Sequence, residues 1–142
     1  MGIRILLVDD HAVVRQGVTS LFATLRPEWT VSEAADGAQA RESVKRMKPD
    51  LVLMDITMPD ASGLEVASYL RGMGYSRPIL IFAMHGSTRL TTDARNTGAQ
   101  GYVLKSQGIN DIVRAIDTLL AGGTFFGAPS PAMPPKALDS GL

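Results

Sequence analysis

Four consecutive apolar residues, 51–54, end abruptly in Asp55 and are followed by the turn sequence Met58-Pro59-Asp60. Such a short run predicts a strand covered on both faces, because a strand of this kind has no solvent-facing positions for polar side chains. Asp55 then falls at the carboxyl end of a buried strand, the edge at which open parallel α/β sheets bind ligands. Taken alone, an aspartate in this position is more often a turn former or a helix cap than a reactive group.

Length and charge limit the kinds of protein this chain can be. Its 142 residues fit one compact domain, and the 14 basic residues are balanced by 14 acidic ones. A net charge of zero argues against a protein that coats DNA or an anionic membrane, because such surfaces are met with an excess of Lys and Arg. The absence of cysteine excludes disulfides and thiolate metal sites. Without a signal-peptide pattern or an apolar run of transmembrane length, the sequence predicts a cytoplasmic domain with no membrane partner.

Short apolar runs alternate with helical periodicities along the rest of the chain. Ser62 and Glu65 form a capping box, and Asp36 with Gln39 resembles a second one. Strands are expected at 3–8, 29–34, 51–54, 79–82 and 102–104, and helices at 14–25, 36–47, 63–71, within 87–96 and at 109–120. The first helix carries its apolar residues at Val14, Val18, Leu21, Phe22 and Leu25. The helix within 87–96 has almost nothing apolar to bury and should be held weakly.

Strands that alternate with helices predict parallel pairing through right-handed crossovers, with helices on both faces of the sheet. The expected fold class is therefore α/β, a flavodoxin-like doubly wound sheet of five parallel strands in the order 2-1-3-4-5. Half of residues 128–135 are proline, a composition typical of a semi-extended linker. We expect a folded domain over 1–124 and an Ala/Pro-rich linker over 125–142.

Polar residues follow the predicted strands. Because parallel strands end along one edge, that edge should gather Asp9, Asp10, Asp55, Ala83 and Lys105. Three carboxylates and one ammonium in a single pocket are costly unless a divalent cation lies among them. Magnesium fits, because it is a hard cation that binds a few carboxylates and keeps waters that a phosphate can replace. Asp55 can then attack phosphorus and form an aspartyl phosphate, with Lys105 as partner of a phosphoryl oxygen. These residues predict a phosphoryl acceptor site.

With these residues in place, the sequence resembles the receiver domain of response regulators in two-component signalling, which has the CheY-like fold. The similarity covers residues 3–123 and rests on Asp9-Asp10, on Met54-Asp55 through Met58-Pro59 with Gly63, and on the run from Gly98-Ala99 to Lys105. His11, Met84-His85, the absence of a proline after Lys105 and the segment 121–124 are similar to the LuxR/NarL-type subgroup. Members of that subgroup continue into a helix-turn-helix DNA-binding domain. The chain is thus expected to stop after the linker, short of such an output domain.

The resemblance implies a role for each matching residue of the acceptor site. Asp55 would accept the phosphoryl group from a histidine kinase. Mg²⁺ would be held by Asp10, Asp55 and the backbone carbonyl of Thr57, with Asp9 assisting, and Lys105 would pair with the phosphoryl group. A receiver of this kind is not a conventional enzyme, although it can catalyse its own phosphorylation and dephosphorylation.

The resemblance also implies switch residues, and one of them departs from the family pattern. Tyr102 would be the aromatic switch whose ring turns inward on activation, while Thr57 and His85 would tune hydrolysis of the acyl phosphate. Ala83 stands where the family carries a switch Ser or Thr, whose hydroxyl bonds the phosphoryl group. A hydrogen bond to a charged group contributes about 1.5–3 kcal/mol. Its loss is expected to weaken the population shift roughly ten- to a hundredfold, which puts coupling to the output in doubt.

Other interpretations of the same residues stay open. Ala83 is also the one observation in favour of a receiver fold that serves as a protein-interaction module without phosphate. A magnesium-dependent phosphatase would also use an aspartyl nucleophile, but its two acids are two residues apart, whereas Asp9 and Asp10 are adjacent. A zinc site at His11 and His85 lacks further ligands, and a nucleotide-binding protein would need a glycine-rich loop after the first strand. Pairing with a second copy of the chain is a further open expectation.

Overall fold

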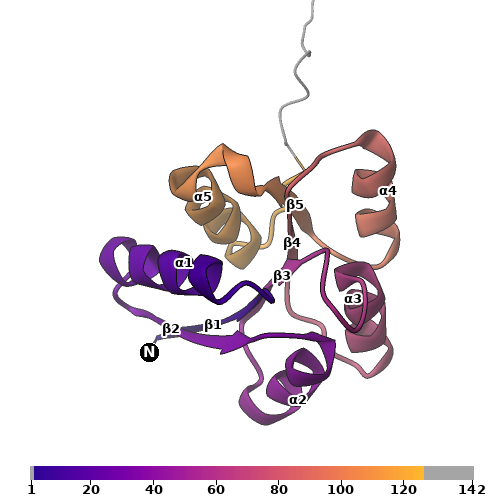
Figure 1. Cartoon of the computed structure of the whole chain (residues 1–142), viewed down its shortest axis with the longest axis horizontal. Helices are drawn as coiled ribbons and strands as arrows, with labels where there is room; N and C mark the ends of the chain where they lie inside the picture. Colours follow the sequence, from indigo (N-terminus) through magenta and orange to yellow (C-terminus); the bar gives the residue numbers. More distant parts are fainter. Residues whose placement is uncertain (1, 127–142) are drawn as a thin grey trace, which may run out of the picture.

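The structure, a computed structural model, describes residues 2–126. Its centre is one sheet of five parallel strands in the order β2-β1-β3-β4-β5 (Figure 1). The strands are β1 (Ile3–Val8), β2 (Trp29–Ala34), β3 (Leu51–Asp55), β4 (Ile79–Ala83) and β5 (Gly101–Leu104). The predicted flavodoxin-like, doubly wound fold and its strand order are therefore confirmed.

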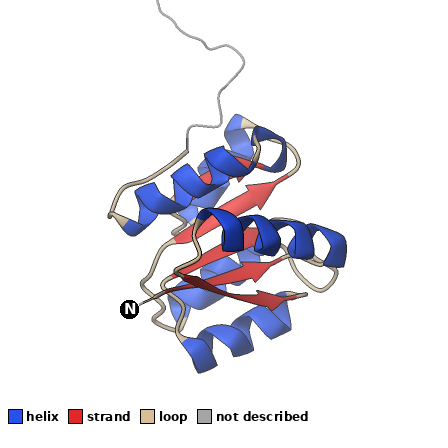
Figure 2. Ribbon diagram, turned by 90° about the vertical axis from the view of Figure 1, so that its left-hand side faces the viewer, coloured by secondary structure: helices blue, strands red, loops and turns tan. Residues whose placement is uncertain are grey.

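Five helices cover the two faces of the sheet (Figure 2). They are α1 (Ala12–Leu25), α2 (Gly37–Met47), α3 (Gly63–Gly72), α4 (Thr88–Asn96) and α5 (Ile109–Leu120), with a 3-10 turn at Lys105–Gln107. The apolar sides of α1 and α5 pack on one face, and those of α2, α3 and α4 pack on the other. Among residues 2–126, no helix is both long enough and apolar enough to cross a membrane.

The strand β3 is buried along its whole length because helices cover both of its faces. Leu51 and Leu53 belong to the core layer with α1 and α5, whereas Val52 and Met54 belong to the layer with α2, α3 and α4. Successive side chains of a strand point to opposite faces, so a strand covered twice needs apolar residues at every position. The last residue, Asp55, lies at the carboxyl edge, and β3 itself runs between β1 and β4.

The expected capping residues hold the starts of α2 and α3. Ser62 accepts a hydrogen bond from the amide of Leu64, and the carboxylate of Glu65 accepts one from the amide of Ser62. Asp36 accepts from the amide of Gln39 at 2.8 Å. These bonds satisfy amide groups that have no partner within the helix.

The apolar residues of the first helix are not all buried. Leu21 is 45 % exposed, whereas Val18 and Phe22 are buried. Val18 and Phe22 are four residues apart and share one stripe of α1, whereas Leu21 lies beside that stripe and stays nearly half exposed.

The amino terminus of α2 is tied to the loop that follows β3. The carboxylate of Asp60 accepts hydrogen bonds from the amides of Gly37 at 2.8 Å and Ala38 at 3.1 Å. These backbone bonds are the main reason that the pKa of Asp60 lies below its usual range. The loop beside Asp55 and the first turn of α2 are therefore held together by one carboxylate.

Replacing Asp60 with asparagine is expected to lower stability at neutral pH and to matter less in acid. A carboxyl group whose folded pKa is depressed stabilises the fold above its unfolded pKa, about 3.9, and loses that contribution as the pH falls through the folded value. Urea unfolding at about pH 7 and about pH 3 measures the difference. Asp93→Asn, an exposed change on α4, is the matched control. An Asp60→Asn deficit that is equal at both pH values would contradict this account.

The chain leaves the domain beside β5. The amide of Phe125 donates to the carbonyl of Gln100, and the amide of Tyr102 donates to the carbonyl of Phe125. Phe125 and Phe126, which were expected to begin the linker, thus lie on the domain, and their side chains pack against its two core layers. Residues 127–142 of the expected linker lie outside the described residues. The helix α4 buries only Ala94, which agrees with the expectation that it is weakly held.

Candidate functional site

The carboxyl edge of the sheet brings together two buried carboxylates and one ammonium group. Asp9 follows β1 and is fully buried, Asp55 ends β3 and is 2 % exposed, and Lys105 follows β5. The ammonium nitrogen of Lys105 donates to Asp9 Oδ2 at 3.0 Å and to Asp55 Oδ2 at 3.2 Å. Residues that are up to 96 positions apart in the sequence therefore form one charged cluster.

Burial shapes the charges of this cluster. It raises the pKa of Asp55, the negative charge of Asp9 raises it further, and the Thr57 amide and the Lys105 ammonium oppose both effects. Burial lowers the pKa of Lys105, but the hydrogen bonds and charges of the two carboxylates outweigh it, so the net shift is upward. Lys105 is therefore a permanent cation beside Asp55.

Lys105 is also positioned by a residue that sequence reasoning did not single out. Its ammonium lies 5.0 Å from the centroid of the Phe82 ring, within the range of a cation–π contact. Phe82 pairs in register with Asp55 across β3 and β4. The pairing register of β3 and β4 is the signal that could have identified Phe82. The residue on β4 that lies opposite Asp55 must flank the pocket.

The acidic groups are arranged so that they could hold a divalent cation. One oxygen each of Asp9, Asp10 and Asp55, together with one ring nitrogen of His11, lie within 4.8 Å of one another. The carboxylate of Asp10 is partly open to solvent, whereas Asp9 and Asp55 are not. The three carboxylates carry more negative charge than the single ammonium of Lys105 balances, so a hard divalent ion bound by oxygen ligands fits both the charge and the chemistry of the donors.

His11 belongs to the acid cluster, but His85 does not. His11 Nδ1 lies 3.2 Å from Asp9 Oδ1 and 3.1 Å from Asp10 Oδ1. His85 contributes only its backbone carbonyl to a described contact, so within residues 2–126 the two histidines do not form the pair that a zinc site would need.

The predicted switch residues lie around the ends of β4 and β5. Ala83 is buried and pairs in register with Leu104. Tyr102 is fully buried in the same core layer as Ala83, and its hydroxyl donates to the carbonyl of His85 at 2.7 Å. The tyrosine ring is therefore already inward in this structure, and its burial raises the pKa of the phenol.

Thr57 and His85, the two residues expected to tune hydrolysis, are both exposed. The amide of Thr57 donates to Asp55 Oδ1 at 3.2 Å and fixes that carboxylate. Its side chain has the solvent access that a residue acting on an attacking water requires.

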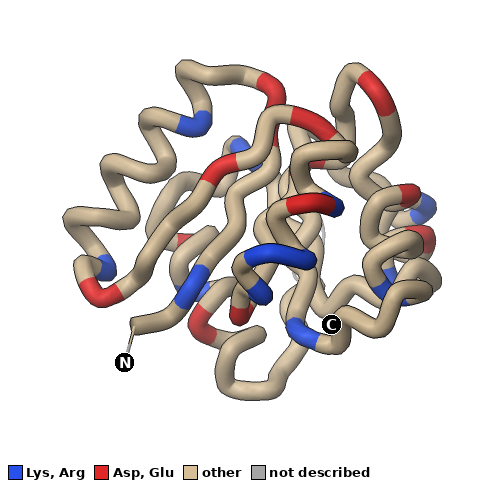
Figure 3. Tube along the Cα trace, turned by 90° about the horizontal axis from the view of Figure 1, so that it is seen from below, with Lys and Arg blue, Asp and Glu red and all other residues tan. Residues whose placement is uncertain are grey.

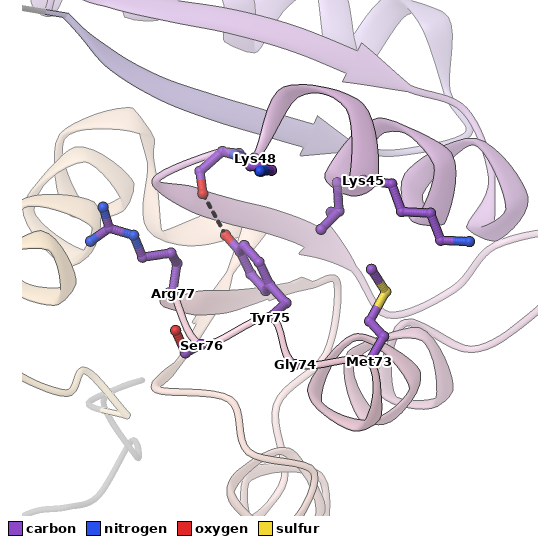
Figure 4. A pocket seen from close by; sticks show the side chains of 9 residues that line it. Lys45, Lys48, Met73, Gly74, Tyr75, Ser76 and Arg77 are labelled. Atoms are coloured by element: carbon purple, nitrogen blue, oxygen red, sulfur yellow. Dashed lines mark hydrogen bonds between the residues drawn. The ribbon is translucent and has the colours of Figure 1, made fainter.

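A second concavity, of about 550 Å³, lies at the opposite, amino-terminal edge of the sheet, between the ends of α2 and α3 (Figure 4). Tyr75 is part of the lining of this concavity, and its hydroxyl donates to the carbonyl of Pro49. Arg77 pairs with Asp50 at 3.4 Å, and the ammonium of Lys45 points away from Tyr75. Its lining holds no carboxylate or imidazole, so the carboxyl edge is the better candidate for chemistry.

Charge is distributed without a basic face on the side of the molecule seen in Figure 3. Acidic and basic positions are interspersed there, in agreement with the net charge of zero. This distribution does not favour coating of a nucleic acid by that side of the domain.

Comparison with known proteins agrees with the fold. The family model of the response regulator receiver domain matches residues 5–117. The nitrate/nitrite response regulator protein NarL of Escherichia coli strain K12 is 36 % identical over 118 residues, which are 83 % of this chain and 55 % of NarL. The chain spans about half the length of the curated relatives it matches.

Two solved structures extend the similarity. A two-component response regulator of the LuxR family from Aurantimonas sp. SI85-9A1 superposes with a TM-score of 0.85 at 38 % identity, covering 91 % of each chain. The signal receiver domain of the putative response regulator NarL from Mycobacterium tuberculosis gives a TM-score of 0.79 at 32 % identity, covering 85 % of this chain and 98 % of that one. The chain belongs to the response regulator receiver domain family, in its LuxR/NarL subgroup.

Proposed function

We propose that the chain is a phosphoacceptor receiver in which Asp55 takes a phosphoryl group from a histidine kinase with Mg²⁺ at the acid cluster. The observation that carries this proposal is the buried group of Asp9, Asp55 and Lys105, in which one ammonium bonds both carboxylates. A buried like-charge pair costs stability, so its presence at a ligand-binding edge indicates a functional site. Asp9, Asp10 and Asp55, with the Thr57 carbonyl, would hold the ion, which when bound withdraws charge from the phosphoryl oxygens.

Each residue of the cluster has a distinct part in the transfer. An oxygen of Asp55 attacks phosphorus and forms the new O–P bond, while the P–N bond to the kinase histidine breaks. The electron pair goes to the imidazole, which takes a proton from solvent. The Thr57 amide holds the other oxygen of Asp55 in place. Lys105 exchanges its bond with Asp55 for one with a phosphoryl oxygen, so the cluster keeps its cation throughout.

The output of this receiver would be transcriptional. Relatives of the chain are named as transcriptional regulatory proteins, and the proposed output is a helix-turn-helix DNA-binding domain joined through the linker. Ala83 has no hydroxyl to bond the phosphoryl group, so coupling would depend on Lys105 and the backbone rather than on a switch Ser or Thr. The proposed histidine kinase would dock over the carboxyl edge, where Thr57 and Asp10 are accessible.

A second candidate function is a receiver that binds partners without phosphate. The observation that favours it is Tyr102, whose ring is inward and bonded to the His85 carbonyl beside an Ala83 that cannot take part in switching. Such a domain would present one fixed surface. A phosphatase is less favoured, because Asp10 is turned to solvent while Asp9 bonds Lys105.

Intact-protein mass after incubation with acetyl phosphate and Mg²⁺ tests the proposal. We expect a gain of one phosphoryl group that is lost in Asp55→Ala and without Mg²⁺, and that persists in the control Asp93→Ala, an exposed change on α4. No gain in the wild-type chain and in Ala83→Thr would overturn the phosphoacceptor function and favour the interaction module. Turnover of a generic phosphate ester would instead favour the phosphatase.

A further inference from the structure

The outer edge of β5 is covered by the end of the described chain. Because β5 is the last strand of the sheet, one side of it has no neighbouring strand. Phe125 pairs there with Gly101 as a parallel bridge, through the Phe125 amide to Gln100 and the Tyr102 amide to Phe125. An open strand edge is a place where any extended segment can pair. Here that place is taken by the residues through which the chain continues beyond the domain.

Side chains hold this segment on both faces of the sheet. Phe125 packs against the core layer of α1 and α5, and Phe126 packs against the layer of α2, α3 and α4. The guanidinium of Arg95, in the last turn of α4, lies 3.9 Å from the centroid of the Phe126 ring. We call Phe125 and Phe126 the exit latch. The latch thus fastens the chain to β5 by backbone bonds and to α4 by a cation–π contact.

Gly101 makes the close approach of the latch feasible. A Cβ at this position would lie 3.0 Å from the carbonyl oxygen of Phe125 and 2.7 Å from Leu80 Cδ1. A side chain at 101 would crowd both Leu80 and the backbone of the latch. The edge is therefore shaped for this segment.

Tyr102 joins the latch to the loop that follows β4. Its amide donates to Phe125 at 2.8 Å, and its hydroxyl donates at 2.7 Å to the carbonyl of His85, in the loop between β4 and α4. Three residues further on, Lys105 bonds Asp9 and Asp55. Tyr102 therefore contacts both the loop at His85 and the latch, and it lies on the same short segment as Lys105.

We propose that the exit latch is a docked element whose attachment to β5 and α4 is set by the state of the acid cluster, so that it controls how the following segment leaves the domain. Control of the latch by phosphorylation rests on the proposed function. Docking of the latch is independent of that function, since it depends only on Phe125, Phe126, Arg95 and the edge of β5.

Amide hydrogen exchange of the whole chain, followed residue by residue by NMR, tests the docking. In Phe126→Ala we expect the amides of Tyr102 and Phe125 to exchange about tenfold faster, because ring burial and the cation–π contact are lost together. Arg95→Ala, which removes only the guanidinium, should give a smaller change of the same sign. Tyr69→Ala is the matched control, since it removes a half-exposed ring that faces Arg41 elsewhere. Equal exchange in Phe126→Ala and Tyr69→Ala would overturn the latch.

The same measurement with acetyl phosphate and Mg²⁺ tests the link to the acid cluster. We expect exchange at Tyr102 and Phe125 to change about threefold or more, in the wild-type chain and not in Asp55→Ala. Tyr102→Phe, which removes the bond to His85, should alter Phe125 exchange without phosphate. The phosphorylated fraction is read by mass in the same sample. A phosphorylated chain with unchanged exchange would overturn the link. Absence of phosphate uptake would overturn the proposed function and the link together, while the alanine variants still decide the docking.

Discussion

Replacing Gly63 with alanine is expected to destabilise the domain by about 3 kcal/mol or more, one of the largest effects of a single methyl group in this chain. Its Cβ would lie 2.2 Å from the carbonyl oxygen of Asp55 and 2.9 Å from Ile56 Cα. Both are backbone atoms, which cannot rotate away as a side chain can. The start of α3 would have to move off the end of β3 and would displace Asp55 with it. Urea unfolding measures the loss, and Mg²⁺ binding should weaken in parallel.

Gly72 provides the control within the same helix. A Cβ there would meet no atom within 4 Å. Gly72→Ala is expected to change stability by less than about 1 kcal/mol, in the stabilising direction that helix propensity favours. If Gly63→Ala unfolded at the same urea concentration as Gly72→Ala, the close contact between α3 and the end of β3 would not be what holds Asp55 in place.

Replacing Lys105 with methionine is expected to cost about 3–5 kcal/mol in the absence of divalent metal, because Asp9 and Asp55 would remain buried without a cation. Methionine keeps most of the apolar stem and removes the ammonium together with its cation–π contact to Phe82. Urea unfolding in a chelating buffer measures the loss. Added Mg²⁺ should restore part of it, since an ion that binds only the folded state stabilises that state by mass action.

The double variant Lys105→Met/Asp55→Asn separates charge from packing. The pKa of Asp55 is raised in the fold, so its ionised form opposes folding at neutral pH, and Asp55→Asn alone should be stabilising. The double variant should therefore recover most of what Lys105→Met loses. A Lys105→Met protein as stable as the control Lys45→Met, an exposed lysine of α2, would show that the two carboxylates do not need their cation.

Local sequence signals accounted for most of the fold. The apolar run of β3 and the capping box of Ser62 and Glu65 act over a few residues, and the structure has them where the pattern predicts. The common edge of Asp9, Asp55 and Lys105 followed from strand direction alone. These three features could be predicted because none of them depends on how side chains from distant elements pack.

The contacts that sequence reasoning missed are those between elements. Phe82 lies beside Lys105 only because β3 and β4 pair in one particular register. Asp60 bonds the first residue of α2, which lies 23 positions earlier in the chain. Phe125 and Phe126 look like the start of a linker until the edge of β5 is in view. The exposure of Leu21 likewise depends on how far the neighbouring elements reach over α1.

The small buried surface of α4 has a consequence for how the sequences of such domains diverge. The helix buries a single alanine, and its other side chains are partly or fully exposed. Substitutions over most of its length therefore cost the core very little, whereas comparable changes in β3 would unfold the protein. After gene duplication, this helix is a surface on which two copies can become different from each other while keeping the same fold and the same acid cluster.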